Sequence, residues 1–242
     1  MPSESTRETA VTDPMPRSRP AGYGHRRAFL QLSAALLLEA LACPARPAAK
    51  ETLPLKIIAF GDSVVAGYGL AADAAFPAVL EKTLRAEGYH VTVINAGVSG
   101  DTASGGQARL DWALGDGADG VILELGANDM LRGIDPQVTR DALDAILARL
   151  AQRHISVLLC GMRAAPNLGA DYGRAFERIY PELAAKYDVP LYPFFLDGVA
   201  AERTLTLSDG LHPNAAGVGV IVRGILPKAE ELIARVRAQK QS

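Results

Sequence analysis

Five short apolar runs alternate with longer amphipathic segments from residue 55 to the end of the chain. The runs contain four to six residues and are rich in β-branched side chains, which is typical of buried strands. Strand–helix alternation predicts a parallel sheet covered on both faces, because each parallel connection has to cross over the sheet. The predicted strands are Ile57–Phe60, Val91–Asn95, Gly120–Leu125, Ile155–Leu159 and Val189–Tyr192. The sequence therefore predicts an α/β domain over residues 52–240, with three layers (α/β/α) and a five-stranded parallel sheet.

Five segments between and after these runs have the apolar spacing of amphipathic helices. In the segment Pro136–Arg153, for example, Leu143, Ile146 and Leu147 fall on one face, and Asp135 stands where an N-cap is expected. The predicted helices are Phe76–Glu87, Gly105–Leu114, Pro136–Arg153, Tyr172–Tyr187 and Ala215–Gln239. We find no internal repeat in this part of the chain, so a single domain is expected.

The first 49 residues differ in composition from the domain. The chain is polar and proline-rich up to residue 24, and Arg26-Arg27 then precede an apolar stretch that ends near Ala42. A basic pair, a short apolar stretch and small residues predict an export signal with a disordered leader over residues 1–49, and no stable membrane span. The pair followed by Phe29-Leu30 resembles a twin-arginine signal, so a periplasmic or secreted protein is expected. Cleavage after Ala42 would leave Cys43 as an alternative site for a lipid anchor, and cleavage near residue 49 would remove it.

Charge and cysteine content exclude several classes of function. The net charge is −2 and no basic run lies in the domain, so a nucleic-acid partner is not expected. Two cysteines, Cys43 and Cys160, are too few for a disulfide framework or a zinc site. Cys160 ends an apolar run and is expected to be a small buried hydrophobe. We expect no metal and no cofactor.

Polar residues follow the predicted strands at the points where the strands end. Ser63 follows the first strand and precedes helix-compatible sequence, Gly100 follows the second, and Asn128 follows the third. After the fifth strand, a longer excursion reaches Asp209 and His212. The carboxyl ends of parallel strands meet at one edge of a sheet, where open α/β sheets bind ligands. We therefore expect all these residues to converge on one rim.

The histidines can be sorted by the same criterion. His90 and His154 directly precede strands and belong at the opposite edge, whereas His212 can reach Ser63. Asp209 is placed to orient His212 and to stabilise its protonated form. The pattern predicts acyl transfer, with Ser63 as nucleophile and His212 as the acid–base group. The alternative interpretations are structural: Ser63 or its neighbour Asp62 as a helix N-cap, and Asp209 as a turn cap.

A tetrahedral oxyanion needs preorganised hydrogen-bond donors. The backbone N–H of Ser63, the backbone N–H of Gly100 and the side-chain amide of Asn128 are the candidates at this rim. The alternative for Asn128 and Asp129 is a loop pair that caps the next turn. Glu124, inside the third strand, is expected to be partly buried and to need a partner, for which Arg109 is a candidate.

Four blocks together carry a family resemblance: Gly61-Asp62-Ser63, Gly100, Gly126-x-Asn128-Asp129 and Asp209-x-x-His212. In this order they resemble the SGNH (GDSL) hydrolases, and most closely the bacterial esterase, acyl-CoA thioesterase I and lysophospholipase L1 (arylesterase) branch. The resemblance implies a flavodoxin-like SGNH hydrolase fold, a catalytic triad of Ser63, Asp209 and His212, and an oxyanion hole of Ser63, Gly100 and Asn128. Ala127 and Ala164-Ala165-Pro166 depart from the branch pattern, the latter along the groove expected to hold the acyl chain.

The resemblance implies a monomeric serine esterase that acts on a small acyl ester: an aryl ester, a short to medium fatty-acyl ester or a lysophospholipid. An acyl-CoA thioesterase or a carbohydrate O-deacetylase could use the same site. A non-enzymatic, flavodoxin-like binding module is disfavoured, because no Gly-rich phosphate fingerprint follows the first strand.

Overall fold

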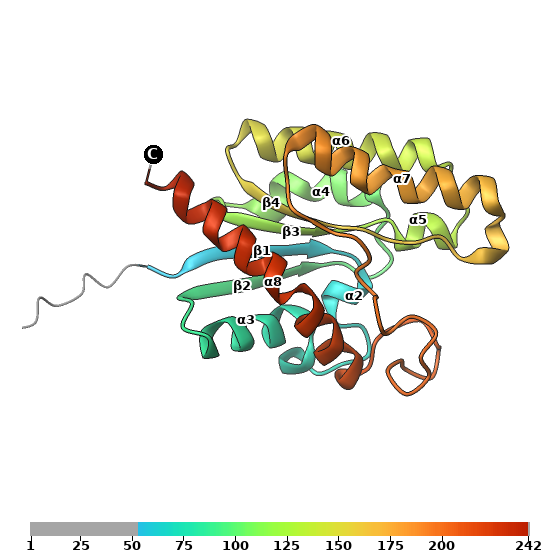
Figure 1. The fold of residues 1–242 in the computed structure, drawn as a ribbon, viewed down its shortest axis with the longest axis horizontal. Coiled ribbons are helices and arrows are strands. Elements are labelled where there is room, and N and C mark those ends of the chain that lie inside the picture. Colours follow the sequence, from blue (N-terminus) through green and yellow to red (C-terminus); the bar gives the residue numbers. More distant parts are fainter. Residues whose placement is uncertain (1–52, 242) are drawn as a thin grey trace, which may run out of the picture. The chain divides into compact units, whose positions relative to one another are not determined.

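The expected five-stranded parallel sheet is confirmed in the computed structural model, which describes residues 53–241 (Figure 1). The strand order is β2-β1-β3-β4-β5, and every neighbouring pair is parallel. The strands are β1 (Leu55–Gly61), β2 (Val91–Gly97), β3 (Gly120–Glu124), β4 (Ser156–Cys160) and β5 (Leu191–Tyr192). The chain runs from β1 out to β2 and then back past β1 to β3, so a topological switch point lies at the carboxyl ends of β1 and β3.

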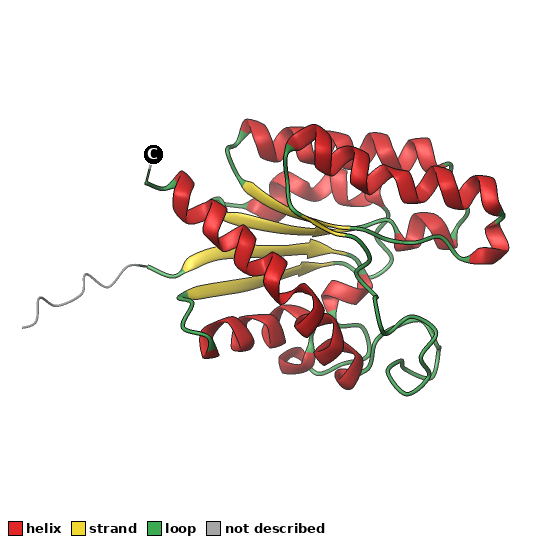
Figure 2. Ribbon diagram, viewed as in Figure 1, coloured by secondary structure: helices red, strands yellow, loops and turns green. Residues whose placement is uncertain are grey.

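Helices cover both faces of the sheet, as the alternation predicts (Figures 1 and 2). On one face, α3 (Phe76–Ala86) packs beside α8 (Ala215–Gln239). On the other face, α6 (Pro136–Gln152) packs between α4 (Ala103–Leu114) and α7 (Ala170–Tyr187). Two short helices, α2 (Ser63–Ala66) and α5 (Ala127–Leu131), lie at the carboxyl edge directly after β1 and β3. The expected caps also form, since the Asp135 side chain accepts a hydrogen bond at the start of α6.

The central strands are buried on both faces, which explains why their sequences read as continuous apolar runs. All five residues of β3 are buried, and Ile57 to Gly61 of β1 are buried as well. Cys160 at the end of β4 is a free, buried thiol, as expected. The edge strand β2 is buried only at Val91 and Val93. Strands β1 and β3, which precede Ser63 and Asn128, are therefore buried in the middle of the sheet, whereas β2, which precedes Gly100, lies at its edge.

Two segments differ from the sequence-based expectation. Residues 127–131 form α5 instead of a loop, and this helix is too short for apolar periodicity to reveal it. Strand β5 has only two residues, because Pro190 and Pro193 flank it and proline cannot donate a ladder hydrogen bond. Short 3-10 turns also form at η2 (Ala72–Ala74) and η3 (Pro166–Leu168). Of these differences, α5 matters for the site, because it places Asn128 on a helix and not on a loop.

The predicted export signal, its arginine pair and Cys43 lie outside the described residues. No helix within residues 53–241 is both long enough and apolar enough to cross a membrane.

Candidate active site

Ser63 is the first residue of α2, at the point where β1 ends. Asp62 is the N-cap, and its Oδ1 accepts a hydrogen bond from the backbone N–H of Val64 at 3.0 Å. Gly61 has to be glycine at this position, because a Cβ there would lie 2.6 Å from the carbonyl oxygen of Glu124 on the neighbouring strand. The N-cap interpretation thus holds for Asp62, and it leaves the Ser63 hydroxyl free to face the rim.

The structure brings Ser63, His212 and Asp209 together at this rim. Nε2 of His212 lies 2.9 Å from Oγ of Ser63, across 149 residues of sequence. Nδ1 of His212 lies 2.7 Å from Oδ2 of Asp209. A hydroxyl, an imidazole and a carboxylate in this chain of contacts can move a proton from the hydroxyl to the imidazole while the carboxylate holds the ring.

Asp209 also shapes the loop that carries His212. Its Oδ1 accepts hydrogen bonds from the backbone N–H groups of Leu211 at 2.9 Å and of His212 at 3.0 Å. The N–H of Leu211, with the side chain and N–H of His212, lowers the pKa of Asp209 to about 2. Both interpretations of Asp209 therefore apply at once, because one carboxylate oxygen caps the turn and the other orients the histidine.

The three candidate oxyanion donors also lie at this edge. The backbone N–H groups of Ser63 and Gly100 have no acceptor within the described part of the chain, and Gly100 has a φ of +85° that suits glycine. Nδ2 of Asn128 donates to Oδ2 of Asp62 at 3.1 Å and to the carbonyl of Asp101 at 3.0 Å. Both N–H groups of the Asn128 amide are thus engaged between the nucleophile turn and the loop after β2, and one of them would have to exchange its acceptor to reach an oxyanion.

Arg109 connects three segments of the rim, and it is not the partner of Glu124 that the sequence suggested. Its Nε lies 2.5 Å from Oδ2 of Asp101, and its two terminal nitrogens donate to the carbonyls of Ala96 at 3.0 Å and Gly61 at 2.9 Å. The guanidinium stacks on the ring of Phe60. The N–H donors of Arg109 are therefore used by Asp101 and by these two carbonyls, and it makes no ion pair with Glu124.

Sequence reasoning also missed Tyr68, whose ring lies on the ring of His212 with 4.5 Å between the ring centroids. Tyr68 follows α2 and stands between Gly67 and Gly69, which both have positive φ. The paired glycines signal a tight turn directly after the nucleophile helix, but they do not show which side chain the turn presents to the histidine.

Glu124 lies under the nucleophile turn and is fully buried, together with Asp62. Its Oε2 accepts from the backbone N–H of Asp62 at 3.3 Å, whereas its Oε1 has no hydrogen-bond partner among residues 53–241. Burial, followed by the charge of Asp62, raises the pKa of Glu124 well above its usual value. Burial also raises the pKa of Asp62 to about 6, against the opposing hydrogen bond from Val64. Burial therefore favours the protonated form of Glu124, which is fully buried beside a second carboxyl group.

This burial predicts a pH-dependent stability. An unfolded chain ionises Glu124 near pH 4.5, whereas the folded chain keeps the proton, so the free energy of unfolding falls as pH rises above that value. Asp62 lowers the free energy of unfolding in the same way, but only between pH 3.8 and about pH 6, the two values of its pKa. Glu124→Gln should therefore weaken the fall in the free energy of unfolding as pH rises above 4.5, to which one retained proton contributes up to about 1.4 kcal/mol per pH unit. Urea denaturation at a series of pH values from about pH 5 upwards measures this dependence.

Glu177→Gln is the matched control for this prediction, because Glu177 is exposed on α7. It should leave the pH dependence of the wild-type protein unchanged. A wild-type and a Glu124→Gln protein with parallel stability profiles over this range would mean that Glu124 is ionised in the folded protein.

A groove of about 290 Å³ extends from Ser63 and His212 over the carboxyl ends of β3, β4 and β5. Its wall after β4 includes Ala164, Ala165 and Pro166, the segment that departs from the branch pattern. Most of the remaining lining is apolar: Val64, Ala127, Met130, Leu131, Met162, Phe194, Leu196, Ala200, Ala201 and Leu211. The groove can therefore hold an apolar chain whose one end lies at the Ser63 hydroxyl.

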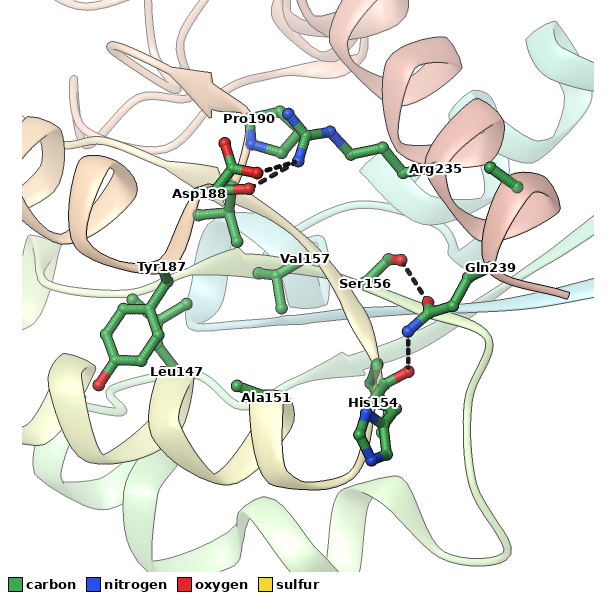
Figure 3. Close-up of a pocket in the computed structure, with 13 residues that line it drawn as sticks. Leu147, Ala151, His154, Ser156, Val157, Tyr187, Asp188, Pro190, Arg235 and Gln239 are labelled. Atoms are coloured by element: carbon green, nitrogen blue, oxygen red, sulfur yellow. Dashed lines mark hydrogen bonds and ion pairs between the residues drawn. The ribbon is translucent and has the colours of Figure 1, made fainter. Parts of the chain in front are cut away.

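A second pocket, of about 370 Å³, lies at the amino edge of the sheet, where the sequence places His154 (Figure 3). Oγ of Ser156 lies 2.9 Å from Oε1 of Gln239, and Nε2 of Gln239 donates to the carbonyl of His154. Arg235 donates to the carbonyl of Asp188 at 2.6 Å. The polar groups of this pocket are thus paired with one another and do not form a second reactive centre.

Within residues 53–241, no cluster of three or more His, Cys, Asp or Glu could hold a metal.

Comparisons with known proteins identify the family of this chain. Residues 59–220 match the GDSL-like Lipase/Acylhydrolase family. Esterase TesA of Pseudomonas aeruginosa is 37% identical over 82% of this chain and 99% of its own length. Thioesterase 1/protease 1/lysophospholipase L1 of Escherichia coli K12 is 41% identical over 70% of this chain and 78% of its own.

A solved structure adds the fold to this similarity. AlinE4, an SGNH-hydrolase family esterase, is 46% identical and has a TM-score of 0.64 over 74% of this chain and 97% of its own. The family match covers most of the chain, and two relatives above 30% identity are matched over most of their length. This protein belongs to the GDSL-like lipase/acylhydrolase family, the SGNH hydrolases.

Proposed function

We propose that this protein is a serine esterase that hydrolyses carboxylic esters through an acyl-enzyme on Ser63. The observation that carries the proposal is the continuous chain of contacts from Oγ of Ser63 to His212 and Asp209, at 2.9 and 2.7 Å. Family membership supports the same reaction class, since relatives carry the names esterase, arylesterase and lysophospholipase.

The reaction follows from the contacts. Nε2 of His212 accepts the Ser63 proton while Oγ attacks the ester carbonyl, and Asp209 stabilises the imidazolium that forms. The negative charge on the former carbonyl oxygen is held by the N–H groups of Ser63 and Gly100 and by the Asn128 amide. His212 then protonates the leaving alcohol, and a water molecule activated by His212 releases the acid from Ser63.

The groove supports an acyl chain of short to medium length, because its wall is apolar and its volume is small. We expect kcat/KM for p-nitrophenyl esters to rise about two- to threefold for each added methylene up to hexanoate, since partial burial of a methylene gives up to about 0.8 kcal/mol. The increase should stop by decanoate, when the groove is full. Steady-state rates over the ester series measure this dependence.

Ala164→Phe is the variant that tests whether the groove holds the acyl chain. The phenyl ring would fill the wall after β4, so kcat/KM for octanoate should fall at least about tenfold more than that for acetate. Ala175→Phe, at an exposed position of α7, is the control for the same change in size. Acetate as the best substrate, with rates that decline along the series, would contradict the proposed acyl groove and favour a deacetylase.

The second candidate is a thioesterase that uses the same triad, and the name of the Escherichia coli relative favours it. An oxygen ester and a thioester of one acyl chain separate the two candidates. We expect the oxygen ester to have the higher kcat/KM, and a thioester preference of more than about tenfold would reassign the enzyme.

A further inference from the structure

One charged side chain stands in the otherwise apolar groove. Apart from the base His212, the only lining residue that carries a charge at neutral pH is Arg163, directly after β4. Its neighbours in the chain, Met162 and Ala164, also line the groove and are apolar. Arg163 is exposed to solvent, so its guanidinium stays hydrated while it lines the groove and can meet an anionic group of a bound ligand.

Arg163 has no carboxylate partner in the part of the chain that the structure describes. Some arginines there are neutralised, since Arg140 pairs with Glu182 and Arg149 pairs with Asp111, and among the residues that line the groove Arg163 is the only arginine. The guanidinium of Arg163 is instead stacked on the ring of Phe194, at 4.9 Å from the ring centroid. Stacking on a second groove residue holds the cation in place and leaves its N–H donors available to a ligand.

The sheet register gives the approximate separation of the two strand ends after which this cation and the nucleophile follow. Gly61 of β1, Glu124 of β3 and Cys160 of β4 lie in one row across the sheet. Ser63 stands two residues beyond Gly61, and Arg163 stands three residues beyond Cys160. Two strand spacings therefore separate the positions, which is about 10 Å.

We propose that the preferred substrates are amphipathic esters with an anionic group, a carboxylate or a phosphate, that Arg163 binds about 10 Å from the scissile carbonyl. This inference rests on the proposed esterase function. An extended chain of about eight carbon–carbon bonds spans that distance, and the apolar wall between Ser63 and Arg163 contacts it. The anion belongs either to the far end of the acyl chain or to the alcohol, and both forms make the same charge-assisted contact.

Matched pairs of esters test the inference. For the acyl side, the p-nitrophenyl monoester of suberic acid is compared with its uncharged terminal amide. For the alcohol side, the hexanoyl ester of 8-hydroxyoctanoate is compared with that of 8-hydroxyoctanamide in a pH-stat. For one of the pairs, the anion should raise kcat/KM of the wild-type enzyme about five- to twentyfold at low salt. About 0.5 M salt should reduce this ratio several-fold.

Variants assign the effect to one side chain. Arg163→Gln should bring the anion-to-amide ratio to about one, and Arg163→Glu should bring it below one. Arg149→Gln makes the same change in net charge on the last turn of α6 and should keep the wild-type ratio. Equal ratios in the wild-type and Arg163→Gln enzymes, or an equal loss in Arg149→Gln, would overturn the inference.

The neutral amide esters separate this inference from the proposed function. Their hydrolysis by the wild-type enzyme is required by the esterase proposal and does not involve Arg163. An enzyme that hydrolyses them but shows no preference for the anion retains the proposed function and refutes the role of Arg163. An enzyme that hydrolyses neither form refutes the esterase proposal, and the inference falls with it.

Discussion

Ser63→Ala should lower kcat for p-nitrophenyl hexanoate by at least about a thousandfold. The remaining rate would come from direct attack of water on an ester that is bound at the oxyanion donors. The alanine has no hydroxyl to donate its proton to His212, so no acyl-enzyme can form. The substitution removes one oxygen atom from a small side chain, and Asp62 still caps α2, so Tm should stay within about 3 °C of the wild type. Rates with purified protein and circular dichroism measure both effects.

Ser99→Ala is the control for this substitution, since Ser99 lies on the loop after β2, next to Gly100. It should keep most of the wild-type activity. Residual activity of more than a few per cent in Ser63→Ala would mean that another group attacks the ester, and equal losses in both variants would point to the fold of the rim.

Asn128→Ala should lower kcat by about 10²–10³ while KM stays nearly constant, because the oxyanion that the amide is proposed to stabilise exists only in the transition state. The structural contribution of Asn128 is smaller. Its Nδ2 donates to Asp62 and to the carbonyl of Asp101, and loss of these bonds should lower the free energy of unfolding by about 1–3 kcal/mol. Steady-state kinetics with urea denaturation on the same protein separates the two effects.

Asn128→Asp should be at least as damaging to kcat as the alanine. A carboxylate at this position would repel the oxyanion and would also face Oδ2 of Asp62, which now accepts from the amide at 3.1 Å. If Asn128→Ala keeps kcat within about threefold and only lowers stability, Asn128 is a structural link between α5 and α2. The oxyanion would then be held by the backbone of Ser63 and Gly100 alone.

The convergence at the rim could be predicted because topology decides it. In a parallel sheet, the end of each strand lies at one edge, so Ser63 and His212 meet there although 149 residues separate them. The same reasoning placed His154 at the opposite edge, where the second pocket lies. This argument from topology needs only the order of strands and helices along the chain, which apolar periodicity reveals.

The second layer of contacts could not be predicted, because it depends on side-chain directions that carry no periodic signal. Arg109 links the ends of β1 and β2 to the loop after β2, and a spacing argument could only suggest Glu124 as its partner. The stacking of Tyr68 on His212 depends on a turn whose shape the sequence does not specify. Helix α5 is shorter than two turns, so apolar periodicity could not predict it. The position of Asn128 in the first turn of this helix could therefore not be predicted either.

Covalent labelling tests most directly whether Ser63 is the nucleophile of this protein. An active-site phosphonate with a p-nitrophenol leaving group phosphonylates the attacking oxygen and mimics the tetrahedral intermediate. After incubation and digestion, mass spectrometry should find one phosphonyl group per protein, on the peptide that contains Ser63. His212→Ala should suppress the labelling, since the hydroxyl then has no base. A label on Ser99 or another residue, or an inactivated enzyme with an unmodified Ser63, would contradict the account.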